Sequence, residues 1–168
     1  MALRRKFYYR TAIFLSGSIA FVAASGRYPP LDLDGILIFG GVFFFVTLAL
    51  AILFERRAVR HLEVEALKRV YYGLVPVPWL LGLLLLLNGA LDHAAPIAYN
   101  ETVVGKFSMS GFLPTNRLVV TSWRSGKQVE RVPVSRLDAD RFHAGDSITV
   151  QVKGGLAGIP WVESVSSR

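Results

Sequence analysis

The side chains of this chain that could carry out chemistry are few, and they lie far apart. Its 168 residues include three histidines, His61, His93 and His143, and no cysteine. No two histidines stand at a metal-binding spacing, and His61 with Glu65 at i,i+4 supplies two ligands without a third. The absence of cysteine excludes a disulfide scaffold, a thiolate zinc site and a cysteine nucleophile. We therefore predict no catalytic residue, no metal and no cofactor.

Two other motifs that could do chemistry are incomplete. The glycine-rich stretch 154–158 resembles a phosphate-binding loop, but no Lys-Ser/Thr pair follows it, and it precedes a strand instead of a helix. The acidic residues Asp138, Asp140 and Asp146 lack the twelve-residue pattern of a calcium loop. We interpret the glycines as a bulged turn and the carboxylates as solvated turn residues.

Three polar residues stand out because they adjoin an apolar segment. Asn88 is the only strongly polar side chain in the apolar segment 72–91, and Asp92 and His93 are the first two residues after that segment. Asn88 could bond another helix, but we favour contact with lipid headgroups. Asp92 and His93 could face a cofactor or a proton path in an enzyme subunit with a shared membrane site. We favour a histidine placed near the carbonyl groups of a helix C-terminus.

These residues must be positioned by three apolar segments, which raise the hydrophobic share of the chain to 52% and its mean hydropathy to +0.43. Residues 35–54 carry no charge over a length that crosses a hydrocarbon core of about 30 Å. Residues 72–91 are also uncharged, with Pro76 and Pro78 near their start. Residues 8–25 are shorter and follow a basic N-terminus, so a cleaved signal peptide is an alternative. We predict three transmembrane helices in residues 1–91.

The basic residues predict the orientation of these helices. Four precede the first span, one lies between the first and second, and five lie between the second and third: Arg4, Arg5, Lys6 and Arg10; Arg27; Arg56, Arg57, Arg60, Lys68 and Arg69. Because cytoplasmic loops carry the excess of Lys and Arg, the N-terminus is predicted inside and the C-terminus outside. Residues 55–71 are predicted to continue the second helix as a cytoplasmic stalk, whose basic residues could touch anionic headgroups.

Residues 92–168 have a different residue pattern, in which short alternating stretches of β-branched residues lie between turns. We predict five strands, near residues 101–110, 117–124, 128–134, 147–153 and 162–166. A short helix over 135–142, with Ser135 as its N-cap, separates the third strand from the fourth. This order predicts a small OB-like or sandwich-like β module, an inference that concerns architecture only.

The positive charge of the chain does not predict nucleic-acid binding. The net charge of +7 comes partly from the basic residues that set the topology, and residues 92–168 carry nine Lys and Arg against seven Asp and Glu. We expect protein subunits and the lipid bilayer as partners and no nucleic acid. Phe112, Trp123 and Trp161 are the candidate contacts with a partner.

The end of the chain, from Phe142 to Trp161, resembles a family of small, uncharacterised bacterial inner-membrane proteins. In that family hydrophobic helices precede a short β domain with a Gly-Asp strand and a Gly-x-Pro-Trp turn, here Gly145-Asp146 and residues 158–161. The resemblance implies a bacterial origin and a domain of unknown function, and it carries over no catalytic residues.

Together these features predict a non-enzymatic accessory or assembly subunit of a larger bacterial membrane complex. The chain devotes more than half of its length to membrane anchoring, and residues 92–168 are too few for a deep pocket. The alternative is a membrane-anchored periplasmic sensor or small-ligand-binding module, which requires a solvent-open cavity in the β module.

Overall fold

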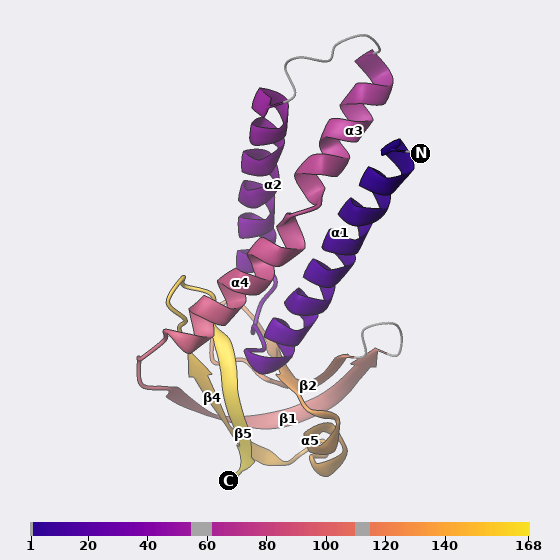
Figure 1. Cartoon of the computed structure of the whole chain (residues 1–168). Coiled ribbons are helices and arrows are strands. Elements are labelled where there is room, and N and C mark those ends of the chain that lie inside the picture. Colours follow the sequence, from indigo (N-terminus) through magenta and orange to yellow (C-terminus); the bar gives the residue numbers. More distant parts are fainter. Residues whose placement is uncertain (1, 55–61, 110–114) are drawn as a thin grey trace. The chain divides into compact units, whose positions relative to one another are not determined.

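A computed structural model describes residues 2–54, 62–109 and 115–168 (Figure 1). The chain divides into two compact units. The first, here called the helical unit, comprises residues 1–27 and 33–87. The second, here called the β unit, comprises residues 28–32 and 88–168 and therefore includes both the connection after the first helix and the last turn of the fourth.

The helices follow the three apolar segments of the sequence. Their bounds are α1 Ala2–Arg27, α2 Asp34–Phe54, α3 Leu62–Leu74 and α4 Val77–Ala90. Among the described residues, two stretches are long and apolar enough to cross a membrane, Asp34–Leu53 and Ala66–Ala90. The second of these combines α3 and α4, which Pro76 separates because proline has no N–H to donate to the preceding turn. α1 is not among them, because Arg10 and several hydroxyl side chains dilute its apolar residues.

The candidate span Ala66–Ala90 and the predicted span 72–91 begin at different residues. The candidate span begins six residues before the predicted start at Tyr72. Residues 66–71 are part of the predicted stalk. They lie in α3, which packs against α2. Residues 55–61 lie outside the described part of the chain.

Small residues bring the helices of this unit together. The Gly17 position faces the indole of Trp79, whose Nε1 donates to the Ile13 carbonyl at 3.1 Å. A Cβ at Gly82 would lie 3.1 Å from the backbone nitrogen of Phe21, so α1 and α4 approach closely. Residue numbers rise together in both helices, and α1 therefore runs parallel to α4.

α2 runs in the opposite direction along the same partners. The Thr47 hydroxyl donates to the Gly73 carbonyl at 2.6 Å, and a Cβ at Gly73 would lie 3.1 Å from the Cα of Leu48. Gly40, about two turns nearer the start of α2, faces the side chain of Leu81 in α4. The contacts run in reverse order along α2, so α2 is antiparallel to α3 and α4.

The β unit contains a five-stranded antiparallel sheet with the strand order β3-β2-β1-β4-β5. The strands are β1 Ile97–Met109, β2 Thr115–Thr121, β3 Val129–Val134, β4 Ser147–Lys153 and β5 Trp161–Ser167. β1 pairs with β4 over residues 97–102 and with β2 over residues 103–109. A bulge between Val103 and Gly105 bends β1 at the change of partner. The edge strands β3 and β5 also contact each other.

The predicted five strands and the helix between the third and fourth are confirmed. Alternating residues of all five strands face one core, which includes Val103, Leu118, Val132, Ile148 and Val162. α5 spans Arg136–Arg141, and the Ser135 hydroxyl caps it by accepting from the Asp138 N–H at 3.1 Å. The main difference is in β1, which begins at Ile97, four residues before the predicted start.

Candidate functional site

Asn88 binds a loop and not another helix or a headgroup. It lies in the last turn of α4 and is 1% exposed. Its Nδ2 donates to the Ile159 carbonyl at 2.9 Å, and its Oδ1 accepts from the Ala157 N–H at 2.8 Å. Its backbone carbonyl accepts from the Leu156 N–H at 3.1 Å. The expected headgroup contact is therefore corrected: one amide satisfies the backbone of the connection between β4 and β5.

Asp92 supports the same connection from its other end. Its Oδ2 accepts from the Gly155 N–H at 2.8 Å and from the Trp161 indole at 3.2 Å, while Oδ1 accepts from the Ala94 N–H at 3.0 Å. Burial alone would raise the pKa of Asp92, but these three hydrogen bonds and the charge of Lys153 lower it overall. The Asp92 carboxylate therefore makes structural contacts within the β unit.

The structure does not bring Asp92 and His93 together in one site. Asp92 is buried and directs its carboxylate to Ala94, Gly155 and Trp161, whereas His93 is exposed. The two neighbours in sequence thus face different surroundings, which gives no geometry for a shared acid–base pair.

The three aromatic candidates for partner contact have different outcomes. Trp161 is 7% exposed and packs edge-on against Tyr28 with ring centroids 5.1 Å apart, so it is placed as a structural residue. Trp123 is half-buried and stacks on Tyr99 with centroids 4.6 Å apart. Phe112 lies outside the described residues. Among the described candidates, Trp123 alone keeps exposed surface for a partner.

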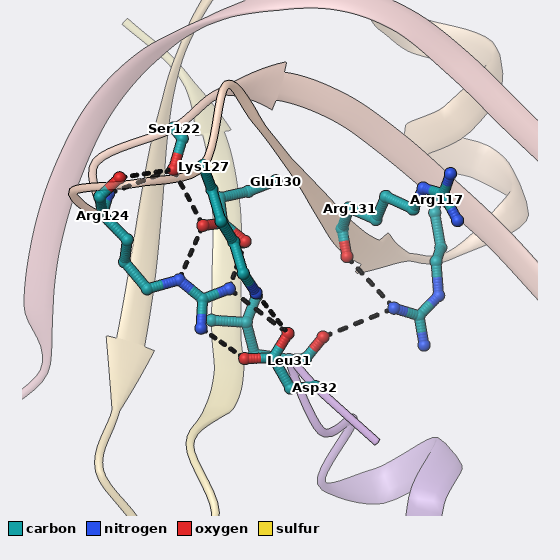
Figure 2. A network of polar contacts seen from close by, with 8 residues as sticks. All are labelled: Leu31, Asp32, Arg117, Ser122, Arg124, Lys127, Glu130 and Arg131. Atoms are coloured by element: carbon teal, nitrogen blue, oxygen red, sulfur yellow. Dashed lines mark hydrogen bonds and ion pairs between the residues drawn. The ribbon is translucent and has the colours of Figure 1, made fainter. Parts of the chain in front are cut away.

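A second polar cluster, which the sequence did not reveal, centres on Arg124 (Figure 2). Its guanidinium forms ion pairs with Asp32 and with Glu130, and its Nε donates to Glu130 at 2.6 Å. The Ser122 hydroxyl lies 2.8 Å from the Glu130 carboxylate, and the Lys127 ammonium lies 3.5 Å from that of Asp32. Asp32 and Arg124 are 92 residues apart, so no local pattern connects them.

The charges of this cluster stabilise one another. Hydrogen bonds from Arg124 lower the pKa of Asp32 below its ordinary value, despite partial burial. Burial would raise the pKa of Glu130, which is 3% exposed, but hydrogen bonds from Arg124 and Ser122 lower it overall. The same two carboxylates raise the pKa of Arg124. All three groups are therefore charged at neutral pH.

The segment that carries Asp32 is built into the sheet by its backbone as well. The Leu31 N–H donates to the Pro160 carbonyl at 2.9 Å, and the Val162 N–H donates to the Pro29 carbonyl at 3.0 Å. The Leu31 side chain joins the core, and the Arg117 guanidinium donates to the Leu31 carbonyl at 3.4 Å (Figure 2). Residues 28–32 thus behave as a short extra strand of the β unit.

Two further features bear on chemistry. No group of three His, Asp or Glu side chains that could hold a metal ion lies among the residues that the structure describes. A shallow, open depression of about 370 Å³ lies at the start of β4, lined by Arg141, Phe142, Asp146, Ser147, Ser167 and Arg168. Its two arginines would suit a small anion, and its openness offers little exclusion of water.

Comparisons with protein-family models, with curated proteins and with solved structures find no match to this chain. The resemblance to small bacterial inner-membrane proteins therefore stays an expectation, and the functional argument rests on the geometry of the two polar clusters.

Proposed function

We propose that this chain is a non-enzymatic accessory or assembly subunit of a larger bacterial membrane complex. The observation that carries this proposal is the set of hydrogen bonds and ion pairs that its polar side chains form. Asn88, Asp92 and Arg124 all hold segments that adjoin the candidate spans within the β unit. The β unit begins at Tyr28, directly after α1, and resumes at Asn88, inside α4. Such a module suits a docking platform for other subunits beside a membrane.

The packing of α1 supports a third transmembrane helix. The Thr11 and Tyr71 hydroxyls are 2.9 Å apart, and the Phe21 backbone lies against Gly82. α1 therefore runs beside the candidate span Ala66–Ala90 over much of its length. A helix in that position crosses the same layer as its neighbour, even though its own composition is less apolar.

The make-up of the β unit supports the proposed sidedness. Residues 28–32 and residues 88–168 belong to one unit, so both must lie on the same side of a membrane. An even number of crossings between them meets this condition, and the two candidate spans supply it. With α1 as a further span, the basic N-terminus lies on the opposite side, which the positive-inside rule assigns to the cytoplasm. The β unit is then periplasmic.

The strand arrangement supports an OB-like module over a sandwich. β1 bends at its bulge and pairs with both β2 and β4, the helix α5 lies between β3 and β4, and β3 contacts β5. These are features of a partly open five-stranded barrel. The fold does not specify a ligand.

Exposed aromatic side chains of the β unit are the proposed contact with other subunits. Trp123 stacks on Tyr99, and Phe107 is exposed with the Arg131 guanidinium 5.5 Å from its ring centroid. Aromatic and arginine side chains are enriched among the interface residues that contribute most of the binding free energy. We expect the partner surface to include these residues.

The test is purification of the tagged full chain from native membranes in mild detergent, followed by native electrophoresis and mass spectrometry. Other subunits in stoichiometric amounts support the proposal. A lone monomer or a homo-oligomer contradicts it.

A pair of variants then locates the contact. Phe107→Ser removes an exposed aromatic ring from the proposed surface, whereas Leu137→Ser changes an exposed residue of α5. We expect the first variant to lose co-purifying subunits and the second to keep them, with both retaining the unfolding midpoint of the native chain. Equal retention by both variants would remove Phe107 from the interface.

A periplasmic ligand-binding or sensing module is the second candidate, and the depression at the start of β4 is the observation that favours it. Arg141 and Arg168 lie together in its lining. Calorimetric titration of the detergent-solubilised chain with inorganic phosphate tests this site, with Arg141→Gln as the control variant. Saturable binding that the variant loses would favour the second candidate.

A further inference from the structure

The connection between β4 and β5 combines an exposed apolar tip with four consecutive hydrogen-bonded N–H groups. Leu156 is 63% exposed at its centre. Four consecutive N–H groups, those of residues 155–158, donate to protein acceptors: Asp92 Oδ2, the Asn88 carbonyl, Asn88 Oδ1 and the Gly155 carbonyl. A loop in water does not need this arrangement, because solvent satisfies its backbone.

The bond from Leu156 to Asn88 sets the depth of this loop. Asn88 lies two residues before the end of the candidate span Ala66–Ala90. At a rise of about 1.5 Å per residue, its carbonyl lies about 3 Å within the span. The Leu156 N–H donates to that carbonyl at 3.1 Å, so the backbone of Leu156 lies level with the last turn of the span.

The composition of the connection fits the same depth. Residues 154–162 contain no charged side chain, and the flanking residues Lys153 and Glu163 pair with each other at 3.5 Å. Leu91, which follows the span directly, is also exposed. An apolar surface at the end of a span, bordered by a charge pair, matches the boundary between hydrocarbon and headgroups.

We propose that the connection Gly154–Gly158 is a membrane-inserted loop that places Leu156 among the lipid acyl chains at the outer boundary of the hydrocarbon layer. Non-helical backbone at that depth requires internal partners for its N–H and C=O groups, since lipid supplies none. Asp92 and Asn88 supply acceptors for the N–H groups of residues 155–157, and the Asn88 amide donates to the adjoining Ile159 carbonyl. This inference rests on the proposed function, because it requires α4 to cross the membrane.

Site-specific labelling tests this inference, and the absence of cysteine from the chain makes each label unique. Full-length Leu156→Cys carries an NBD fluorophore and is reconstituted into vesicles of phosphatidylcholine and phosphatidylglycerol. Leu137→Cys is the matched control, because Leu137 is an exposed apolar residue of the same unit. Leu50→Cys, at an exposed position of α2, reports on the span itself.

We expect the label at position 156 to emit at shorter wavelength than the label at 137, to lose emission with doxyl-labelled lipid and to resist dithionite. The label at 137 should react with dithionite, and doxyl-labelled lipid should not change its emission. Equal dithionite reactivity at 156 and 137 overturns the inference, as does protection at 156 without doxyl quenching, which would indicate protein cover. If position 50 is also reached by dithionite, the membrane topology fails as well. Quenching at 50 without quenching at 156 rejects the loop alone.

Discussion

Two short segments beside the candidate spans, residues 28–32 and 88–92, join the β unit by different kinds of interaction. The first uses the ion pairs of Asp32 with Arg124 and Lys127, together with backbone pairing to Pro160 and Val162. The second uses the amide of Asn88 and the carboxylate of Asp92, which bond mainly to backbone N–H groups.

The difference follows from what each segment must satisfy. Charged pairs such as Arg124–Glu130 need every charge compensated, because removing one partner leaves the other buried and unpaired. A neutral amide such as Asn88 accepts one bond and donates another without the desolvation cost of a charge. The ionic attachment therefore depends on charge balance, and the amide attachment depends on shape and hydrogen-bond geometry.

The largest effect is expected from Arg124→Met, which breaks the ionic attachment. It leaves the buried Glu130 carboxylate without its partner, and we expect the free energy of unfolding to fall by about 3–5 kcal/mol. Denaturant titration of the full chain in detergent measures this change. The double variant Arg124→Met/Glu130→Leu should recover much of the loss, because no unpaired charge remains. A single variant as stable as the native chain would contradict the assigned network.

Next in size is Gly155→Ala, which disturbs the geometry of the amide attachment. Gly155 has φ +75°, and an added Cβ would collide with the Asn88 side chain and the Ile159 carbonyl. Backbone strain and overpacking together predict a loss of about 2–4 kcal/mol. Gly158→Ala, with φ +72° and open space around it, should cost only about 1 kcal/mol, and Gly154→Ala should be nearly neutral. Equal costs at the three glycines in thermal unfolding would argue against the described loop.

Asn88→Leu removes the amide but keeps a similar volume. The Ala157 N–H and the Ile159 carbonyl lose their partners, and we expect a loss of about 2 kcal/mol in the same denaturant titration. This loss should not depend on salt, unlike that of Arg124→Met. Leu87→Ala, an exposed change one residue earlier, is the control with an expected loss below about 1 kcal/mol. A loss equal to that of the control would show that the two hydrogen bonds contribute nothing.

Acid should weaken both attachments. The pKa values of Asp32 and Asp92 lie below the ordinary 3.8 and that of Glu130 below 4.5. A carboxyl whose pKa is lower in the folded state contributes stability that is present above its unfolded value and lost as the pH falls through its folded value. Thermal midpoints should therefore be level near neutral pH and fall below about pH 4.5. Asp92→Asn should flatten this dependence. An unchanged acid slope in that variant would show that Asp92 does not contribute.

The smallest effect is expected from Lys127→Ala. The ammonium lies 3.5 Å from Asp32 and is 47% exposed, so solvent screens the pair. We expect a change of at most about 1 kcal/mol, reduced further at high salt. A larger loss, measured by thermal unfolding at low salt, would mean that Lys127 carries part of the charge balance now assigned to Arg124.

Much of the architecture could be predicted from local sequence. Alternating β-branched residues indicated all five strands, and Ser135 indicated the cap of α5, because these signals act over a few neighbours. The candidate span begins at Ala66, six residues before the predicted start at Tyr72. Lys68 and Arg69 suggested a cytoplasmic connection there, whereas α3 is held against α2 by Thr47 and Gly73.

The site could be predicted only in part. Asn88 and Asp92 were selected as polar residues at the end of an apolar segment, and Trp161 was selected as a candidate partner contact. All three lie in one cluster. Their partner, the connection 154–160, was interpreted as a bulged turn without a link to Asn88. The cluster of Asp32 with Arg124 had no sequence signal, because its members are separated by nearly the whole membrane region.

The sequence by itself determined the apolar segments, the strand and turn pattern and the asymmetry of basic charge, since these depend on composition and on periodicities of a few residues. Tertiary structure alone decided that residues 28–32 become part of the β unit, that Arg124 pairs with both carboxylates, and that Asn88 bonds the loop around Leu156. These contacts join residues between 6 positions apart, Arg124 and Glu130, and 133 positions apart, Pro29 and Val162. They exist only because the curled sheet brings the two membrane-adjacent segments to its edge, where buried polar groups must find partners.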